Sequence, residues 1–267
     1  MKNDKITFRE CAEKMIEVFG DNAKVGLCFL VAATFRKIIR DELSFFPILH
    51  LYGPIATGKT EMGHSLTSFF DTCPQRLNIN NMTEWELADV MSEKSNVIVH
   101  IDEYRNNINA RKKENLKGIW HGSVFNKGER KAVNSACIMS GQDIPDIDEA
   151  LFNRMLVLKF PKASFTEDNA AKLKELQTIC KNGVTHLPVQ IMNYREYFRE
   201  YFIKNWNEVL ADMTRLVHVT NTCEDRILKN WAVLLSSFRC MEMMIKFPMS
   251  YYEMLEICLF GYKEQLG

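Results

Sequence analysis

Residues 53–60 form a glycine-rich loop with the pattern Gly-x-x-x-x-Gly-Lys-Thr. A short apolar run, 48–52, precedes the loop, and a helical pattern continues from Lys59 to about Phe70. Because glycine has no Cβ, such a loop can turn several backbone N–H groups toward one point and hold an anion there. The order strand, loop, helix therefore predicts a phosphate-binding P-loop rather than a plain glycine turn.

The residue types in the loop predict its ligand. Lys59 can bind the β- and γ-phosphates, Thr60 can offer its hydroxyl to Mg²⁺, and the next helix directs its positive N-terminus at the anion. We therefore predict that the chain binds a nucleoside triphosphate, ATP with Mg²⁺. The residues expected to contact it are Gly53, Pro54, Ile55, Ala56, Thr57, Gly58, Lys59, Thr60 and Glu61.

A second strand signal lies downstream, where the apolar run 97–101 is followed by Asp102 and Glu103. A carboxylate at the carboxyl end of a parallel strand can hold the metal, so Asp102 is predicted to share Mg²⁺ with Thr60. Glu103 is predicted to orient and polarise the attacking water, as a hydrolase requires. His100, inside the run, is interpreted as a packed core residue. The alternative is a buried strand that ends in solvated acids.

Gln142 follows another apolar run, 136–139. If that run forms the strand beside the one that ends at Asp102, Gln142 lies next to the γ-phosphate and can sense it or help to place the water. An ordinary Ser-Gly-Gln turn at 140–142 is the alternative.

Arg154 precedes the apolar run 155–160, so it is presented at one end of the predicted sheet. A cation there can reach the γ-phosphate bound to a neighbouring subunit and stabilise the charge of the transition state. A structural salt bridge to Asp148 or Asp143 is the alternative. Arg226, near the start of a later helix, is a weaker candidate for a second phosphate sensor.

The basic residues of this chain are concentrated in one stretch. Residues 105–131 contain eight basic and two acidic residues, whereas the whole chain has 34 of each. Lys127, Arg130 and Lys131 lie in a turn between a helix and a strand, where they can bind the phosphates of a nucleic acid. A solvated charged face is the alternative.

Five strand-like runs with helical patterns between them predict an α/β fold, a P-loop NTPase with a parallel five-stranded sheet and helices on both faces. We predict an N-terminal helical region at 1–46, an ATPase core at 47–163 and a C-terminal helical region at 164–267. Eight cysteines without a C-x-x-C pair are typical of reduced thiols, and the longest apolar run, 25–35, is too short to span a bilayer. We therefore expect a cytoplasmic protein without a membrane partner.

The set of motifs resembles the AAA+ ATPase core of superfamily-three helicases and of primase-helicases from phages and mobile elements. The resemblance covers about residues 44–163 and rests on the strand and P-loop, VIVHIDE, the basic turn before SACIMSGQ, and LFNRMLVLKF. It implies a homo-oligomeric ring, usually a hexamer, with ATP between subunits and single-stranded DNA in the channel. It also implies that Lys127, Arg130 and Lys131 lie near a channel-facing hairpin. Gln142 departs from the family, which usually has asparagine there.

The function predicted from these residues is an ATP-hydrolysing motor of helicase type that acts on DNA in the replication of a phage-like or mobile element. Its catalytic residues are Lys59, Glu103, Gln142 and Arg154. The residues show no primase motif, so a primase or another replication protein is an expected partner. The alternative is an ATP-switched assembly module with slow turnover and no translocation. A small-molecule kinase is disfavoured, because the adjacent acids 102 and 103 suit water activation.

Overall fold

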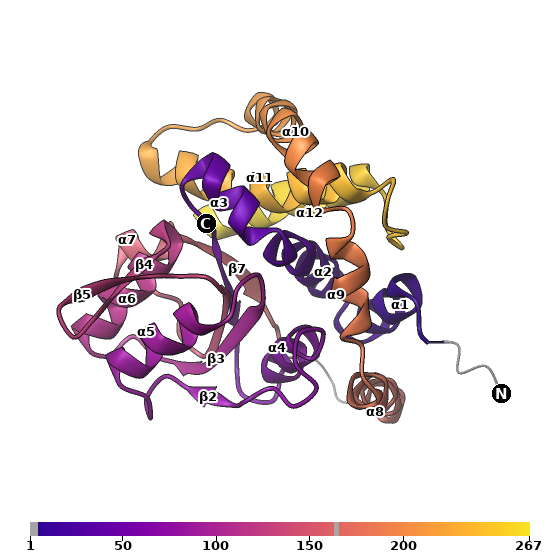
Figure 1. Cartoon of the computed structure of the whole chain (residues 1–267), viewed down its shortest axis with the longest axis horizontal. Coiled ribbons are helices and arrows are strands. Elements are labelled where there is room, and N and C mark those ends of the chain that lie inside the picture. The colour runs from indigo at the N-terminus through magenta and orange to yellow at the C-terminus, as the bar shows by residue number, and fades with distance from the viewer. Residues whose placement is uncertain (1–4, 163–165) are drawn as a thin grey trace.

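A parallel five-stranded sheet forms the centre of the computed structural model, which describes residues 5–162 and 166–267 (Figure 1). Its strand order is β2-β3-β6-β1-β7, so the predicted sheet is confirmed. The strands are β1 (Ile48–Tyr52), β2 (Leu77–Asn78), β3 (Ile98–Tyr104), β6 (Ala136–Gly141) and β7 (Met155–Lys159). All five carboxyl ends consequently lie at one edge, where the motif residues of β1, β3 and β6 meet.

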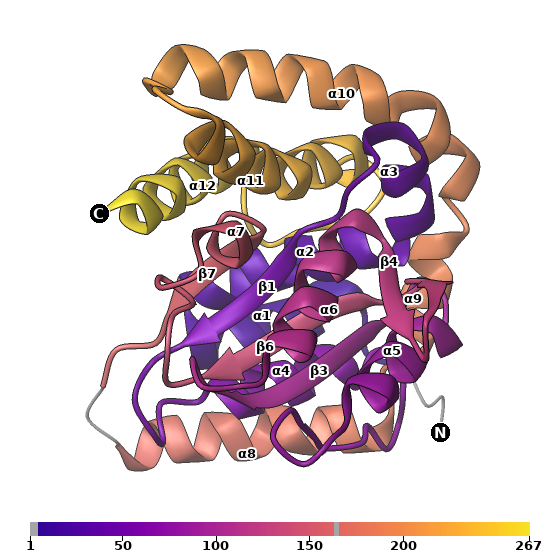
Figure 2. The same ribbon diagram turned by 90° about the vertical axis from the view of Figure 1, so that its left-hand side faces the viewer.

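Helices cover both faces of the sheet, as the sequence predicts (Figure 2). Successive strand residues point to opposite faces. Leu49 and Leu51 of β1 therefore enter the same apolar core as α1 (Phe8–Phe19), α2 (Asp21–Thr34) and α4 (Lys59–Thr67). Ile48 enters the core on the other face, which α5 (Glu84–Glu93) and α6 (Ala110–His121) cover.

Local signals explain where several helices begin and end. Thr83 accepts a hydrogen bond from the Glu86 N–H while the Glu86 carboxylate accepts one from the Thr83 N–H, a capping box that fixes the start of α5. Gly20, with a φ of 58°, ends α1. A further helix, α3 (Arg36–Leu43), follows α2 because the chain leaves helical geometry at Phe35, whose ring stacks on Phe198.

The C-terminal part of the chain is helical, as predicted, and packs back onto the rest of the molecule. Trp231 and Tyr262 from this part are fully buried in the core that contains α1 and α2. The predicted boundary between 163 and 164 lies outside the described residues. The helices are α8 (Glu167–Asn182), α9 (His186–Met192), α10 (Arg195–Leu216), α11 (Thr222–Met241) and α12 (Tyr251–Leu266).

The basic turn proves to be a β-hairpin outside the central sheet. Its strands, β4 (Ser123–Asn126) and β5 (Glu129–Ala132), are antiparallel and follow α6 directly. Lys127 and Gly128 have φ values of 50° and 89°, the two positive values typical of a tight hairpin turn. One short helix, α7 (Glu149–Phe152), precedes β7. Within residues 5–162 and 166–267, no helix combines the length and apolar character needed to cross a membrane.

Candidate active site

The P-loop connects β1 to α4 at the carboxyl edge of the sheet, and two of its glycines are required by its shape. A Cβ on Gly53 would lie 2.3 Å from the carbonyl oxygen of Phe160, and Gly58 has a φ of 92°. The Gly53 N–H donates to the carbonyl of Gly141 at 3.3 Å, which ties the loop to β6. The loop therefore combines close backbone approach with left-handed geometry, both of which favour glycine.

Lys59 directs its ammonium group into the loop. Its Nζ donates to the Pro54 carbonyl at 2.5 Å and to the Thr57 hydroxyl at 3.3 Å. Burial lowers the pKa of Lys59, and the carboxylates of Asp102 and Glu103 oppose that shift. The cation thus lies where phosphate oxygens would meet both it and the N–H groups of the loop.

Asp102 lies across from the loop and is held by three hydrogen bonds. Its Oδ2 accepts from Thr60 Oγ1 at 3.0 Å, and its Oδ1 accepts from Ser140 Oγ at 2.5 Å and from the Glu103 N–H at 2.8 Å. Burial alone would raise the pKa of Asp102, but these donors and nearby His100 outweigh it and lower the pKa. Asp102 is therefore an ionised carboxylate at neutral pH.

Thr60 and Asp102 fit the metal role that the sequence predicts for them. Mg²⁺ prefers oxygen ligands at 2.0–2.1 Å in octahedral geometry, so neighbouring ligand atoms lie about 3 Å apart. The Thr60 hydroxyl and the Asp102 carboxylate oxygen are 3.0 Å apart. This donor pair can hold Mg²⁺ directly or through its water shell.

Glu103 lies in a β-bulge at the end of β3. The register with β6 shifts between Ile101 and Tyr104, and Glu103 has a φ of 65°, which is uncommon for a residue other than glycine. Asn80, from the loop after β2, donates to the Glu103 carbonyl at 2.9 Å. The bulge turns the exposed Glu103 side chain away from the regular direction of the strand, beside Asp102.

Ser140 and His100 extend the hydrogen-bond network from Asp102 into the protein interior. The sequence did not predict this connection. His100 is buried, as predicted, and its Nε2 lies 2.6 Å from Ser140 Oγ. Burial lowers the pKa of His100 to about 4, so its ring is neutral. Because the Ser140 hydroxyl donates its hydrogen bond to Asp102, the Ser140 oxygen accepts a hydrogen bond from the Nε2–H of His100. Ser140 and Asn80 are polar residues near the carboxyl ends of strands. That position is the sequence signal that could have suggested them as site residues.

Gln142 follows β6, and β6 lies between β3 and β1. β6 is therefore the neighbour of the strand that carries Asp102, which is the arrangement that the predicted role of Gln142 requires. Gln142 is half-buried at the same edge of the sheet as the P-loop and Asp102.

Arg154 lies at the opposite edge of the sheet. It precedes β7, and its carbonyl accepts from the N–H of Ile48, the first residue of β1. The P-loop begins after the last residue of β1, so about 16 Å of extended strand separates the two edges. Arg154 therefore does not face the P-loop of its own chain.

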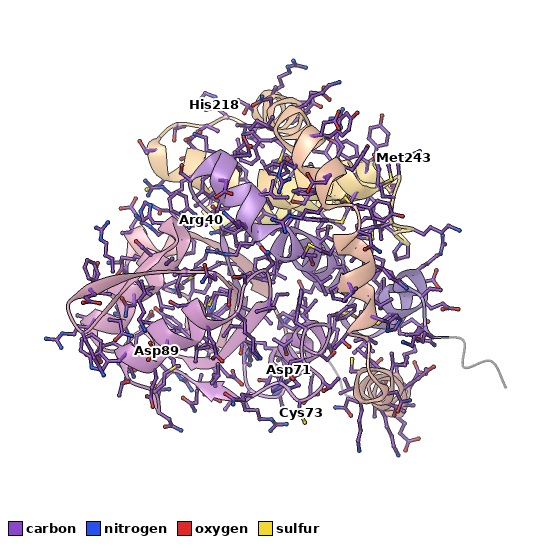
Figure 3. The ribbon with its side chains drawn as sticks, in the orientation of Figure 1. Arg40, Asp71, Cys73, Asp89, His218 and Met243 are labelled. Atoms are coloured by element: carbon purple, nitrogen blue, oxygen red, sulfur yellow. The ribbon has the colours of Figure 1, made fainter. Side chains whose placement is uncertain are left out.

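Arg154 belongs to a set of residues that we call the arginine cluster: Trp120, His121, Arg40, Arg154 and Arg226. The guanidinium carbons of Arg154 and Arg226 each lie 5.5 Å from the Trp120 ring centre, and Arg154 lies 3.2 Å from His121 Nε2. Arg40, labelled in Figure 3, donates to the Gly122 carbonyl at 3.3 Å. Burial lowers the pKa of His121, and the three arginines lower it further.

The salt bridge proposed as an alternative for Arg154 is not formed. Asp143 pairs with Arg105 at 3.7 Å, and Asp148 pairs with Lys117 at 3.0 Å. Among the described residues, no carboxylate lies within ion-pair distance of the arginines of the cluster. The cluster is therefore a cationic surface that can accept an anion.

The three basic residues of the hairpin have different surroundings. Lys127 lies in the turn, and Arg130 lies with its guanidinium carbon 5.4 Å from the centre of the Phe125 ring. Lys131 forms an ion pair with Asp89 of α5 at 2.5 Å. Of the three predicted contacts to nucleic acid, Lys131 therefore has its charge largely balanced within the chain.

A cavity of about 590 Å³ opens beside the first P-loop residues, Gly53 and Pro54. Its walls come from the start of α2, the end of β7 and α12, and include Asn22, Phe160 and Phe260. Apolar and aromatic walls with a few polar groups suit a flat organic ring.

No protein-family model matches this sequence, and no curated protein matches it by sequence. Solved structures do match. One, described as the active helicase Cch of SCCmec type IV, has a TM-score of 0.75 at 14% identity over 98% of this chain and 51% of its own. A full-length MCM homolog from Methanopyrus kandleri has a TM-score of 0.56 at 12% identity over 94% of this chain and 57% of its own.

This chain spans 51% and 57% of the length of those two proteins, a little over half in each case. At these identities the match establishes the fold alone. The chain has an α/β P-loop NTPase fold of the AAA+-like type, which it shares with these two structures.

Proposed function

We propose that this chain is an ATP-hydrolysing motor of helicase type, related to superfamily three, that acts on single-stranded DNA. The observation that supports the proposal is that two sets of predicted site residues lie at opposite edges of one sheet. Lys59, Thr60, Asp102 and Glu103 lie at the carboxyl edge, and Arg154 lies at the amino edge. Replication of a phage-like or mobile element, alongside a primase or another replication protein, is the setting that the motif resemblance favours.

In the proposed reaction, Lys59 and the loop N–H groups bind the phosphates of ATP, and Thr60 and Asp102 hold Mg²⁺. When bound, Mg²⁺ neutralises charge on the β- and γ-phosphates. Glu103 accepts a hydrogen bond from a water molecule and orients it toward the γ-phosphorus, while Gln142 contacts the γ-phosphate. The cavity beside Gly53 takes the nucleoside.

The arginine cluster is proposed to act on ATP bound to a neighbouring copy. A heterologous contact that brings one amino edge to the next carboxyl edge generates a ring if the rotation closes. Arg154, with Arg226 beside it, then supplies positive charge to the transferring phosphoryl group. The working unit is thus a homo-oligomer, for which the motif resemblance implies a hexamer.

The proposal is tested by the rate of ATP hydrolysis with and without single-stranded DNA at low and moderate salt. We expect DNA to stimulate hydrolysis, and we expect added salt to weaken DNA binding, because phosphate contacts release counterions. Lys59→Ala is the inactive control. Absence of both stimulation and salt-sensitive binding would contradict the motor. ATP-dependent assembly that persists in Glu103→Gln without DNA affinity would instead support the ATP-switched assembly module.

A further inference from the structure

Trp120 lies at the centre of the arginine cluster, and its ring is fixed in two ways. It is the last residue but one of α6 and is only 8% exposed. Phe45 stacks on the indole ring, with ring centres 4.6 Å apart and an angle of 17° between the planes. The indole N–H donates to Oδ1 of the fully buried Asn230 at 2.9 Å. The ring therefore cannot turn without breaking a buried hydrogen bond.

Two guanidinium groups lie against this ring although their charges repel each other. The guanidinium carbons of Arg154 and Arg226 are each 5.5 Å from the ring centre. Burial lowers the pKa of Arg154, and the positive charge of Arg226 lowers it further. An arginine within about 6 Å of an aromatic ring centre is attracted by the electron-rich face of the ring. The indole of Trp120 therefore offsets part of the repulsion between the two cations.

The buried amide of Asn153 completes the support of the two arginines. Its Oδ1 accepts from Arg226 at 2.9 Å and from Arg154 at 3.4 Å. Its carbonyl accepts from Nδ2 of Asn230 at 3.0 Å, so one buried side chain holds both the indole ring and Asn153. A carboxylate would also attract the arginines, but it would balance their charge. Neutral groups hold the cations in place and leave the charge available for an anion.

We propose that Trp120 is a positioning residue for the shared active site, which presents Arg154 and Arg226 as a pair to the phosphates of ATP bound to the neighbouring copy. The inference rests on the proposed function and adds to it the group that sets the geometry of the trans-acting cations. A free arginine side chain loses rotamer freedom when it binds phosphate. A ring that holds both guanidiniums in advance lowers this cost.

The first test measures ATP hydrolysis and nucleotide binding in Trp120→Leu, which keeps an apolar side chain without a π face. We expect kcat to fall at least about tenfold, because two cation–π contacts are lost. The Kd for ADP should be unchanged, since the P-loop lies at the opposite edge of the sheet and ADP lacks the γ-phosphate. Trp120→Phe keeps an aromatic face and should retain most of the activity.

Mixing experiments separate a positioning role from a general loss of structure. Trp120→Leu keeps an intact P-loop, so hydrolysis should reappear when it is mixed with Lys59→Ala, whose arginine cluster is intact. Hydrolysis should not reappear when Trp120→Leu is mixed with Arg154→Ala, because both changes damage the same side of the interface. Should Trp120→Leu not fold, Trp120→Met takes its place, because the flexible methionine side chain fills irregular space.

Trp206→Leu is the matched control. Trp206 is 6% exposed and packs edge-on against the same Phe45 ring, but no arginine of the described residues lies over it. Its replacement should leave kcat unchanged. The inference is overturned if Trp120→Leu keeps wild-type activity while Arg154→Ala is inactive, if Trp206→Leu or Trp120→Phe loses as much activity as Trp120→Leu, or if Lys59→Ala does not restore hydrolysis. If Arg154→Ala keeps wild-type activity, the proposed shared site fails, and this inference fails with it.

Discussion

Asp102 is the residue on which the proposed metal site depends, and its orientation is set from a neighbouring strand. Ser140 of β6 donates to Asp102 Oδ1 and accepts from His100, so one carboxylate oxygen is committed to the interior. The other oxygen lies 3.0 Å from the Thr60 hydroxyl. Because Oδ1 is held by Ser140, the carboxylate cannot rotate freely, and Oδ2 remains available for the proposed metal.

Ser140→Ala should impair hydrolysis by weakening the hold on Mg²⁺. A hydrogen bond to a charged group contributes about 1.5–3 kcal/mol, so we expect kcat/KM to fall roughly tenfold or more at limiting Mg²⁺. The pKa of Asp102 should rise, because a donor that lowers it is lost. The measurement is ATPase rate against Mg²⁺ concentration, and the loss should shrink as Mg²⁺ increases.

The control for this variant is Ser237→Ala, which removes an equally buried hydroxyl that donates to the carbonyl of Val233 in its own helix. It should leave the Mg²⁺ dependence unchanged. A Ser140→Ala enzyme with wild-type Mg²⁺ dependence would show that Ser140 does not position Asp102.

The residues that the sequence predicts for this site are those whose roles follow from adjacency in the chain. Lys59 and Thr60 are neighbours in one motif, and Asp102 and Glu103 follow one apolar run. Ser140 is 38 positions from Asp102, and the two meet only because β6 pairs with β3. An apolar run predicts a strand but not its neighbour, so this contact required the structure.

At the scale of elements, the hairpin is mounted on α6 by close backbone contact. A Cβ on Gly118 of α6 would lie 2.2 Å from the carbonyl oxygen of Ser123, the first residue of β4. Two arginines of α3 hold the ends of the hairpin, since Arg36 donates to the Val133 carbonyl at 2.8 Å and Arg40 donates to that of Gly122. The hairpin is thus joined at its base to the arginine cluster, to which Arg40 also belongs.

Gly118→Ala should destabilise the protein, although alanine is usually preferred to glycine inside a helix. Alanine in a helix interior is about 1 kcal/mol more favourable than glycine, so an open site would gain stability. Here the added methyl group meets a backbone carbonyl that cannot rotate away, and we expect a net loss of about 1–3 kcal/mol. Urea denaturation measures the change in the free energy of unfolding.

Lys113→Ala, at a half-exposed position on the same helix, serves as the control and should change stability by less than about 0.5 kcal/mol. A stabilised Gly118→Ala protein would mean that β4 does not lie against α6 as described.

The hairpin was predicted only as a basic turn because its strands lack the alternation that marks a half-buried strand. All four residues of β5 are exposed, and three of them are charged. Its strongest local signal is the Lys127-Gly128 pair, whose positive φ values define the turn. The break between α2 and α3 at Phe35 has no glycine or proline signal in the sequence, and long-range packing of the Phe35 ring on Phe198 accompanies it.

At the scale of the whole molecule, the fold separates the two halves of the proposed catalytic machinery. The P-loop and Asp102 lie at the carboxyl edge, and the arginine cluster lies at the amino edge. The cluster draws Arg40 from α3, Arg154 from the turn before β7 and Arg226 from α11. Their assembly depends on N- and C-terminal helices packing in one core, which no local pattern could predict.

The claim that one active site requires two copies is tested most directly by mixing inactive variants. Glu103→Gln should lack the water-orienting group, and Arg154→Ala should lack the trans-acting cation, whose counterparts elsewhere contribute about 10³–10⁵-fold in rate. Each variant alone should be inactive. After random mixing in equal amounts, about a quarter of the interfaces should combine an intact P-loop half with an intact arginine.

We therefore predict that ATP hydrolysis reappears when Glu103→Gln is mixed with Arg154→Ala, and that it does not when Glu103→Gln is mixed with Lys59→Ala, because both of those changes damage the same half. Wild-type activity in Arg154→Ala alone, or no recovery in the first mixture despite co-assembly, would contradict a site shared between subunits.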